Sequence, residues 1–162
     1  FLGEGSTAGI GHDAAISVGM IYAITMAANV WMVIWKNQKV VLANAVNLLN
    51  GGQADPNAAA AGRRALLASR QNMIFSVSML WFMVGSAHFY GAYETATPSS
   101  AATYVIIAVV IGAVLQLNAL GKLGGTAATN KLLWPYESHK NALITSGILW
   151  LVLWLLSEFQ LA

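Results

Sequence analysis

The sequence predicts an all-α integral membrane protein, a four-transmembrane-helix bundle with both termini outside, forming a single membrane domain over residues 1–162. Composition is the first reason. Hydrophobic residues make up 57% of the chain and charged residues 9%, whereas soluble domains carry about 25% charged residues. Four long apolar stretches and the placement of the basic residues are the other two reasons.

The predicted spans are about residues 14–35, 73–93, 101–120 and 141–161. Each stretch is close to the roughly 20 residues that a helix needs to cross a hydrocarbon core of about 30 Å. Lone strands would leave backbone amides unpaired in lipid, so we expect the stretches to be helices.

The connections between the spans carry clear turn signals. Residues 36–72 are more polar, with a break at Asn50-Gly51-Gly52 between flanks rich in Ala and Leu, and they predict a cytoplasmic helical hairpin. Ser99 or Ser100 is the expected N-cap of the third span, and Ser138 that of the fourth.

Basic residues set the predicted orientation. On a four-pass path all eight Lys and Arg fall on one side of the membrane, and the opposite side receives only acidic residues. The positive-inside rule therefore places the hairpin and the last connection in the cytoplasm.

Polar residues within the spans are expected to hold the helices together, because lipid provides no hydrophobic force between them. Asn29, Gln116 and Asn118 should each face another helix, and Gly19 begins a stripe of small residues that permits close approach. For Asn29 and Asn118 a structural role is favoured over a functional one.

Several classes of function are excluded or disfavoured. The chain has no cysteine, so it has no disulfide, no thiolate metal site and no covalently attached c-type haem. Eight basic residues cannot both border a membrane and form a broad phosphate-binding face, so no nucleic acid partner is expected. Lipids are expected partners, and no P-loop or nucleophile elbow occurs.

The three histidines are the residues most suited to hold a cofactor. His12 and His88 fall near the outer ends of the first two spans, where two imidazoles could bind the iron of a haem b. Two alternatives stay open: interfacial side chains bonded to water or carbonyls, and a copper or zinc site that includes Asp13. His139 lies on the cytoplasmic side and cannot join them.

Two stretches are more specific than a generic membrane helix: NVWMVIWKNQK at 29–39, and SRQN at 69–72 followed through MLWFM to SAHF at 86–89. With Gly11-His12 they resemble the membrane domain of the bacterial membrane-bound urate oxidases, the urate hydroxylases that end in a c-type cytochrome. The resemblance covers the later half of that membrane domain, without the cytochrome. The residues that match are Asn29, Trp31, Asn37, Gln38, Arg70, Asn72 and His88.

The resemblance implies a multi-pass protein of the bacterial inner membrane coupled to electron transfer through a c-type cytochrome. We therefore expect an electron-transfer subunit, with other membrane protein subunits and a separate cytochrome as partners. The alternative is a non-catalytic accessory subunit of a larger redox or energy-converting complex. A stand-alone urate oxidase is the third hypothesis, and it is disfavoured because the cytochrome is missing.

Overall fold

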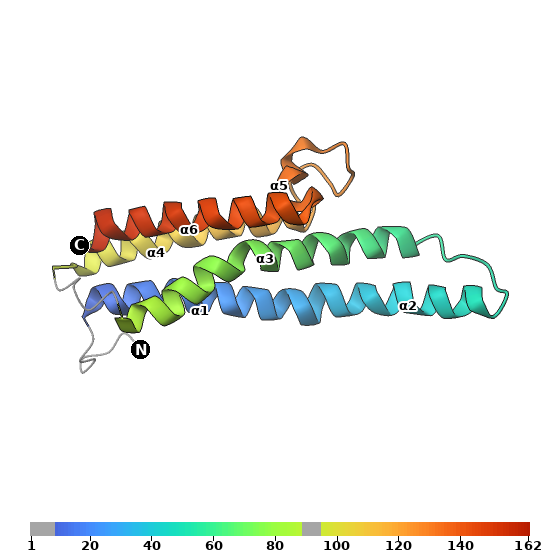
Figure 1. The fold of residues 1–162 in the computed structure, drawn as a ribbon, viewed down its shortest axis with the longest axis horizontal. Helices are drawn as coiled ribbons and strands as arrows, with labels where there is room; N and C mark the ends of the chain where they lie inside the picture. The colour runs from blue at the N-terminus through green and yellow to red at the C-terminus, as the bar shows by residue number, and fades with distance from the viewer. Residues whose placement is uncertain (1–8, 89–94) are drawn as a thin grey trace.

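The fold is given by a computed structural model that describes residues 9–88 and 95–162. Within these ranges every regular element is a helix, so the all-helical prediction is confirmed. Figure 1 shows long helices lying side by side, with one pair extending well beyond the others.

The first helix is one rod from Ile10 to Leu49, longer than the predicted span of residues 14–35. It consists of α1 (Ile10–Ala28), a π-helical segment η1 (Asn29–Ile34) and α2 (Trp35–Leu49). The rod ends at Asn50, after which Gly51 adopts a positive φ of 78°. No proline or glycine interrupts residues 20–49, so nothing stops the helix at the membrane border.

The return helix, α3 (Ala58–His88), runs beside the whole rod. Its first half lies beside α2, and the two form the hairpin that the sequence predicts for residues 36–72. Its second half packs against α1, α4 and α6 and is the centre of the bundle.

The last two long helices are α4 (Pro98–Ala119) and α6 (His139–Leu161), joined through η3 (Lys131–Leu133) and α5 (Trp134–Glu137). The N-cap of α4 is Thr97 and not Ser99 or Ser100, because the Thr97 hydroxyl accepts from the Ser100 amide and Pro98 takes the first helical position. Ser138 is confirmed as the N-cap of α6, with its hydroxyl accepting from Asn141 N at 3.0 Å.

Three helices are long and apolar enough to cross a membrane within the described ranges: Ile10–Leu49, Pro98–Ala119 and His139–Leu161. This finding supports a membrane protein. Helix α3 is not among them, because its described apolar part, residues 73–88, is shorter than the roughly 20 residues that a span needs. The end of the predicted span 73–93 falls outside the described residues.

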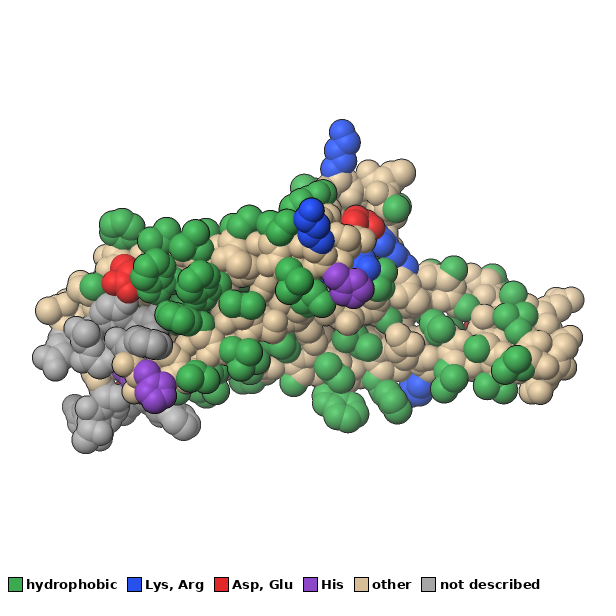
Figure 2. Space-filling model, viewed as in Figure 1, with side chains coloured by type: hydrophobic (Ala, Val, Ile, Leu, Met, Phe, Trp, Pro, Cys, Tyr) green, Lys and Arg blue, Asp and Glu red, His purple; other side chains and the backbone are tan. Residues whose placement is uncertain are grey.

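Charge divides the molecule into two ends. All eight Lys and Arg belong to α2, to the first half of α3, or to the segment from Lys122 to the start of α6. On the face drawn in Figure 2, blue side chains lie from the middle of the molecule toward the hairpin, and we call this side the hairpin end. We call the opposite end, where α1 begins and α6 finishes, the terminal end.

Candidate functional site

Three amide side chains from three helices meet inside the bundle. Asn29 Nδ2 donates to Asn72 Oδ1 at 2.8 Å and to Gln116 Oε1 at 3.0 Å, while Gln116 Nε2 donates back to Asn29 Oδ1 at 2.6 Å. Asn72 Nδ2 completes the cluster by donating to the Met26 carbonyl at 3.0 Å. We call Asn29, Asn72 and Gln116 the amide cluster. Asn29 is 2% exposed, so its three bonds form away from solvent.

The π-helical segment η1 starts at Asn29, the central residue of the amide cluster. A π segment widens one turn of a helix, and such bulges are frequent at functional sites. The widened turn is held by the Trp35 amide, which donates to the Val30 carbonyl, and by Asn37 Nδ2, which donates to the Val33 carbonyl at 2.8 Å. The polar residues Asn29 and Asn37 thus begin and support the irregular turn.

A crevice of about 210 Å³ adjoins the amide cluster between α1 and α4. The ring of Tyr22 forms one wall and stacks on Phe75, with centroids 4.3 Å apart and planes 17° apart. Tyr22 also donates to the Ala108 carbonyl at 3.0 Å. The crevice is lined by Ile21, Tyr22, Thr25, Phe75, Val109, Gly112, Ala113 and Gln116.

Glycine makes the approach of α1 and α4 possible at this point. A Cβ on Gly112 would lie 2.8 Å from Tyr22 Cε1, closer than real Cβ contacts come. Gly19 has the same role toward α3, because a Cβ there would lie 3.1 Å from the Met83 backbone nitrogen. The prediction that Gly19 permits close helix approach is therefore confirmed.

A second polar group lies at the hairpin end of the bundle and ties α3 to the segment before α6. Arg63 pairs with Glu137 through two hydrogen bonds, one of 3.1 Å, and donates from Nε to the Thr126 carbonyl at 3.0 Å. Arg70 donates to the Tyr136 carbonyl. The hydrogen bond from Arg63 is the main reason that the pKa of Glu137 is lowered from its ordinary value, and burial raises the pKa of the Tyr136 hydroxyl.

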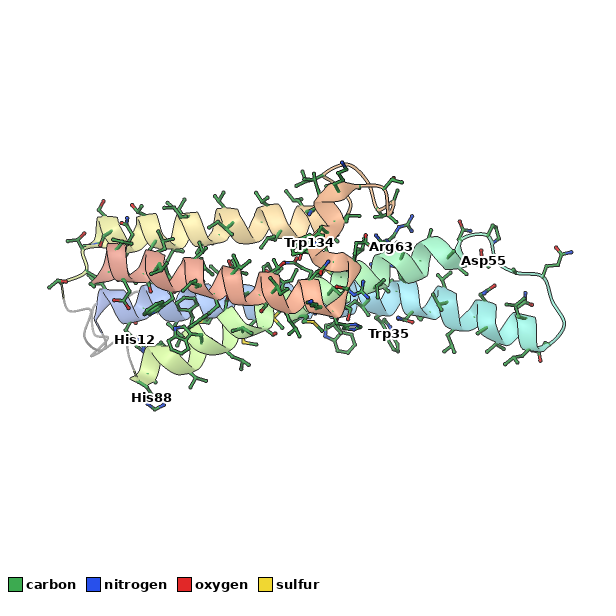
Figure 3. The ribbon with its side chains drawn as sticks, turned by 45° about the horizontal axis from the view of Figure 1, so that its top comes forward. His12, Trp35, Asp55, Arg63, His88 and Trp134 are labelled. Atoms are coloured by element: carbon green, nitrogen blue, oxygen red, sulfur yellow. The ribbon has the colours of Figure 1, made fainter. Side chains whose placement is uncertain are left out.

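The structure places His12 and His88 at the same terminal end but does not make their rings converge. His12 is partly buried and its Nδ1 lies 3.2 Å from Asp13 Oδ1, whereas the His88 side chain is exposed and points out of the bundle (Figure 3). Two axial imidazoles of one haem must face each other across the iron. These side chains do not fit a shared haem as they stand.

Within residues 9–88 and 95–162 there is also no group of three or more His, Cys, Asp and Glu side chains placed to hold a metal ion. His139 starts α6 at the hairpin end and is exposed. The haem ligation by His12 and His88 therefore stays a prediction from the sequence.

The other residues singled out by the resemblance separate into two groups. Asn29 is buried, and Asn72 and Arg70 are half-buried and hydrogen-bonded to other parts of the chain. In contrast, Trp31 is 68% exposed and Gln38 also faces outward. The structure adds Tyr22, which sequence reasoning treated only as one of many interfacial aromatic residues. Its spacing from Asn29, seven residues on one helical face, is the signal that could have found it.

Comparison with known families adds one finding. A family model described as "Urate oxidase N-terminal" matches residues 8–154, which extends the similarity from the first two helices through most of α6. No curated protein and no solved structure matches the chain.

Proposed function

The chain belongs to the urate oxidase N-terminal family, and on this premise we propose that it is a membrane subunit associated with electron transfer that works with a separate c-type cytochrome. The hydrogen bond between Asn29 and Asn72 carries the proposal. It joins the two stretches by which the chain resembles the urate hydroxylases, so Asn29 and Asn72 belong to one site although they are 43 positions apart in the sequence. These 162 residues contain no cysteine, so they hold no covalently attached haem themselves.

The proposal includes a topology. The chain crosses a bacterial inner membrane four times, with both termini outside and the α2–α3 hairpin in the cytoplasm. The gathering of all eight Lys and Arg at the hairpin end supports this orientation. The second half of α3 supports the fourth span, because it packs against three helices that are each apolar enough to cross.

The alternative function is that of an accessory subunit that stabilises a larger redox or energy-converting complex. Helix α2 favours it, because none of its residues is buried and Leu49 is 87% exposed. Apolar side chains that point into water on a long hairpin are typical of a surface that another protein covers.

The test of electron transfer uses native membranes that contain the chain and its c-type cytochrome, with urate as the electron donor that the family name suggests. We expect urate-dependent reduction of the cytochrome, followed by its absorption bands, to require the chain. Asn29→Leu should reduce the rate strongly, since it removes the three bonds of the amide cluster. The control is Gln53→Leu in the exposed hairpin loop, which should leave the rate unchanged.

Asn29→Leu is interpretable only if the variant folds, so its helicity by circular dichroism and its elution on gel filtration are measured in parallel. Cytochrome reduction that is equally fast in membranes without the chain would overturn the electron-transfer proposal. Stoichiometric purification with a complex whose activity does not depend on Asn29 would favour the accessory role instead.

Haem binding is a separate proposal and has a separate test. Ligation by His12 and His88 requires the His88 side chain to turn toward α1, and it predicts b-type absorption bands in the purified chain that disappear in His88→Ala. His139→Ala, at the opposite end, is the matched control. A spectrum without such bands removes the haem and leaves the subunit role standing.

A further inference from the structure

The centre of the bundle holds polar side chains that the amide cluster does not use. Gln71 and Ser78 of α3 and Ser146 of α6 are each 0% exposed. Among the described residues, neither amide atom of Gln71 and neither of the two hydroxyls has a hydrogen-bond partner. Buried polar groups without partners are costly and rare in native proteins, so each one calls for a partner of some kind.

From their positions on the two helices we place these three side chains at the contact between α3 and α6, which we call the seam. The two helices run in the same direction, and their register is set by the contact of Trp81 with Trp150, whose ring centroids are 5.4 Å apart. Ser78 precedes Trp81 by three residues and Ser146 precedes Trp150 by four, so the two serines lie at about the same depth. Gln71 is seven residues before Ser78, on the same face and about 10 Å nearer the hairpin end.

Other serines of the same helices behave differently. Ser76, Ser86 and Ser157 each donate to a carbonyl of their own helix, at 2.8, 3.0 and 2.7 Å. That local bond is the usual way for a serine to satisfy its hydroxyl within a helix. Ser78 and Ser146 do not form it, although they are buried as completely as Ser157.

We propose that the α3–α6 seam is a water inlet, in which ordered water molecules enter from the hairpin end and bond to Gln71, Ser78 and Ser146. Water fits because it is the smallest molecule that both donates and accepts hydrogen bonds, and the Gln71 amide needs both a donor and an acceptor. The unpartnered Nε of Arg70 lies at the entrance, and the unpartnered Nε1 of Trp150 lies at the inner limit.

The inlet is closed toward the terminal end. Phe82 and Leu153, one turn beyond Ser78 and two turns beyond Ser146, are both 0% exposed and carry no polar group. With the topology proposed above, the inlet leads from the cytoplasm to the level of Trp150 and supplies water and protons to the middle of the membrane. The inference rests on the proposed function for that topology only.

The test uses the natural absence of cysteine, which lets a single introduced thiol report on its surroundings. Ser78→Cys and Ser146→Cys are placed in the seam. Val77→Cys and Leu143→Cys are controls within one helical turn of them, 40% and 58% exposed on the outside of the bundle. Sealed vesicles of each orientation are treated with Ag⁺, which travels in water and binds thiolate. The vesicles are then dissolved in detergent and the remaining thiols are counted with a maleimide.

We expect the seam cysteines to react at least about tenfold faster than their neighbours, because each unit by which an apolar site raises the pKa of a thiol removes nine-tenths of the reactive thiolate. The reaction should proceed only from the hairpin side. Adding Gln71→Leu should slow it at Ser146→Cys, because the substitution removes the amide that holds water between the entrance and this position.

Equal reactivity of seam and neighbouring cysteines, or reaction from the terminal side, would overturn the inlet. Unchanged labelling of Ser146→Cys in the Gln71→Leu background would show that the amide holds no water and would equally count against it. Labelling needs neither cytochrome nor urate, so its outcome does not depend on the outcome of the electron-transfer test.

Discussion

The two halves of the first helix have different surroundings although they form one unbroken rod. Helix α1 buries six residues, among them Val18, Gly19 and Tyr22, whereas α2 buries none. The reason is the number of neighbours: within the described residues α1 packs against α3 and α4, while α2 packs mainly against α3 and η1. A helix with one neighbour on one side cannot enclose a side chain, however apolar it is.

The polar contacts of the two regions differ in the same way. In the bundle, Asn29 bonds residues 43 and 87 positions away in the sequence. At the tip of the hairpin, the side-chain bonds stay within the turn, such as Asn44 Oδ1 accepting from Asp55 N at 2.7 Å, 11 positions away. Distant parts of the chain are therefore joined in the bundle, and the tip of the hairpin is a local structure.

Exchanging glycine for alanine in each region should give the largest contrast. Gly112→Ala drives a methyl group into the Tyr22 ring and should cost about 1–3 kcal/mol of unfolding free energy. Gly62→Ala in the hairpin meets only Val41 at an ordinary 3.6 Å and should stabilise by up to about 1 kcal/mol. Unfolding in mixed micelles, followed by helicity, measures both changes. Equal effects of the two substitutions would contradict the difference in packing between the bundle and the hairpin.

Removing the amide cluster should have the next largest effect. Asn29→Leu leaves Asn72 and Gln116 without their shared partner and should destabilise by about 1–2 kcal/mol, near the upper end for hydrogen bonds between membrane helices. Asn47→Leu, which removes one bond to the Gln53 carbonyl at the hairpin tip, should cost clearly less. The same unfolding titration compares them, and the reverse order would show that the hairpin holds the fold together.

Acid should weaken the contact between the two regions. The pKa of Glu137 is lowered by Arg63, so the pair contributes stability above the ordinary carboxyl pKa of 4.5 and loses it as the pH falls through the lower folded value. The loss should be about 0.5–1 kcal/mol, since both side chains are partly exposed and screened. Stability measured between pH 7 and 3 should fall less in Glu137→Gln, and identical pH profiles would argue against the pair.

Charging the outer face of the hairpin should have the smallest effect. Leu49→Glu changes a side chain that is 87% exposed, and it should alter the unfolding free energy of the isolated chain by less than about 0.5 kcal/mol. The matched substitution in the bundle is Leu153→Glu, at 0% exposure, which should prevent folding. If Leu49→Glu strongly destabilises the isolated chain, α2 has a partner within the protein that its exposure does not reveal.

Local chemistry allowed much of this architecture to be predicted from the sequence. The apolar stretches, the glycines after Ala119 and the cap at Ser138 each act within a few residues, so the helices and most of their ends could be predicted. The gathering of the basic residues at one end could be predicted from the order of the spans and their connections alone. The continuation of the first helix past Lys36 into the hairpin could also be predicted, because neither glycine nor proline interrupts the chain before Gly51.

The meeting of polar groups was decided only by the tertiary structure. The sequence showed that Asn29, Asn72 and Gln116 lie within helices and must find partners, but three helices had to take one register before these amides came within 3.0 Å of one another. The directions of His12 and His88 likewise depend on how helix ends rotate, which hydropathy does not encode. Helix formation is a property of neighbouring residues, while a shared hydrogen bond depends on the packing of the whole bundle.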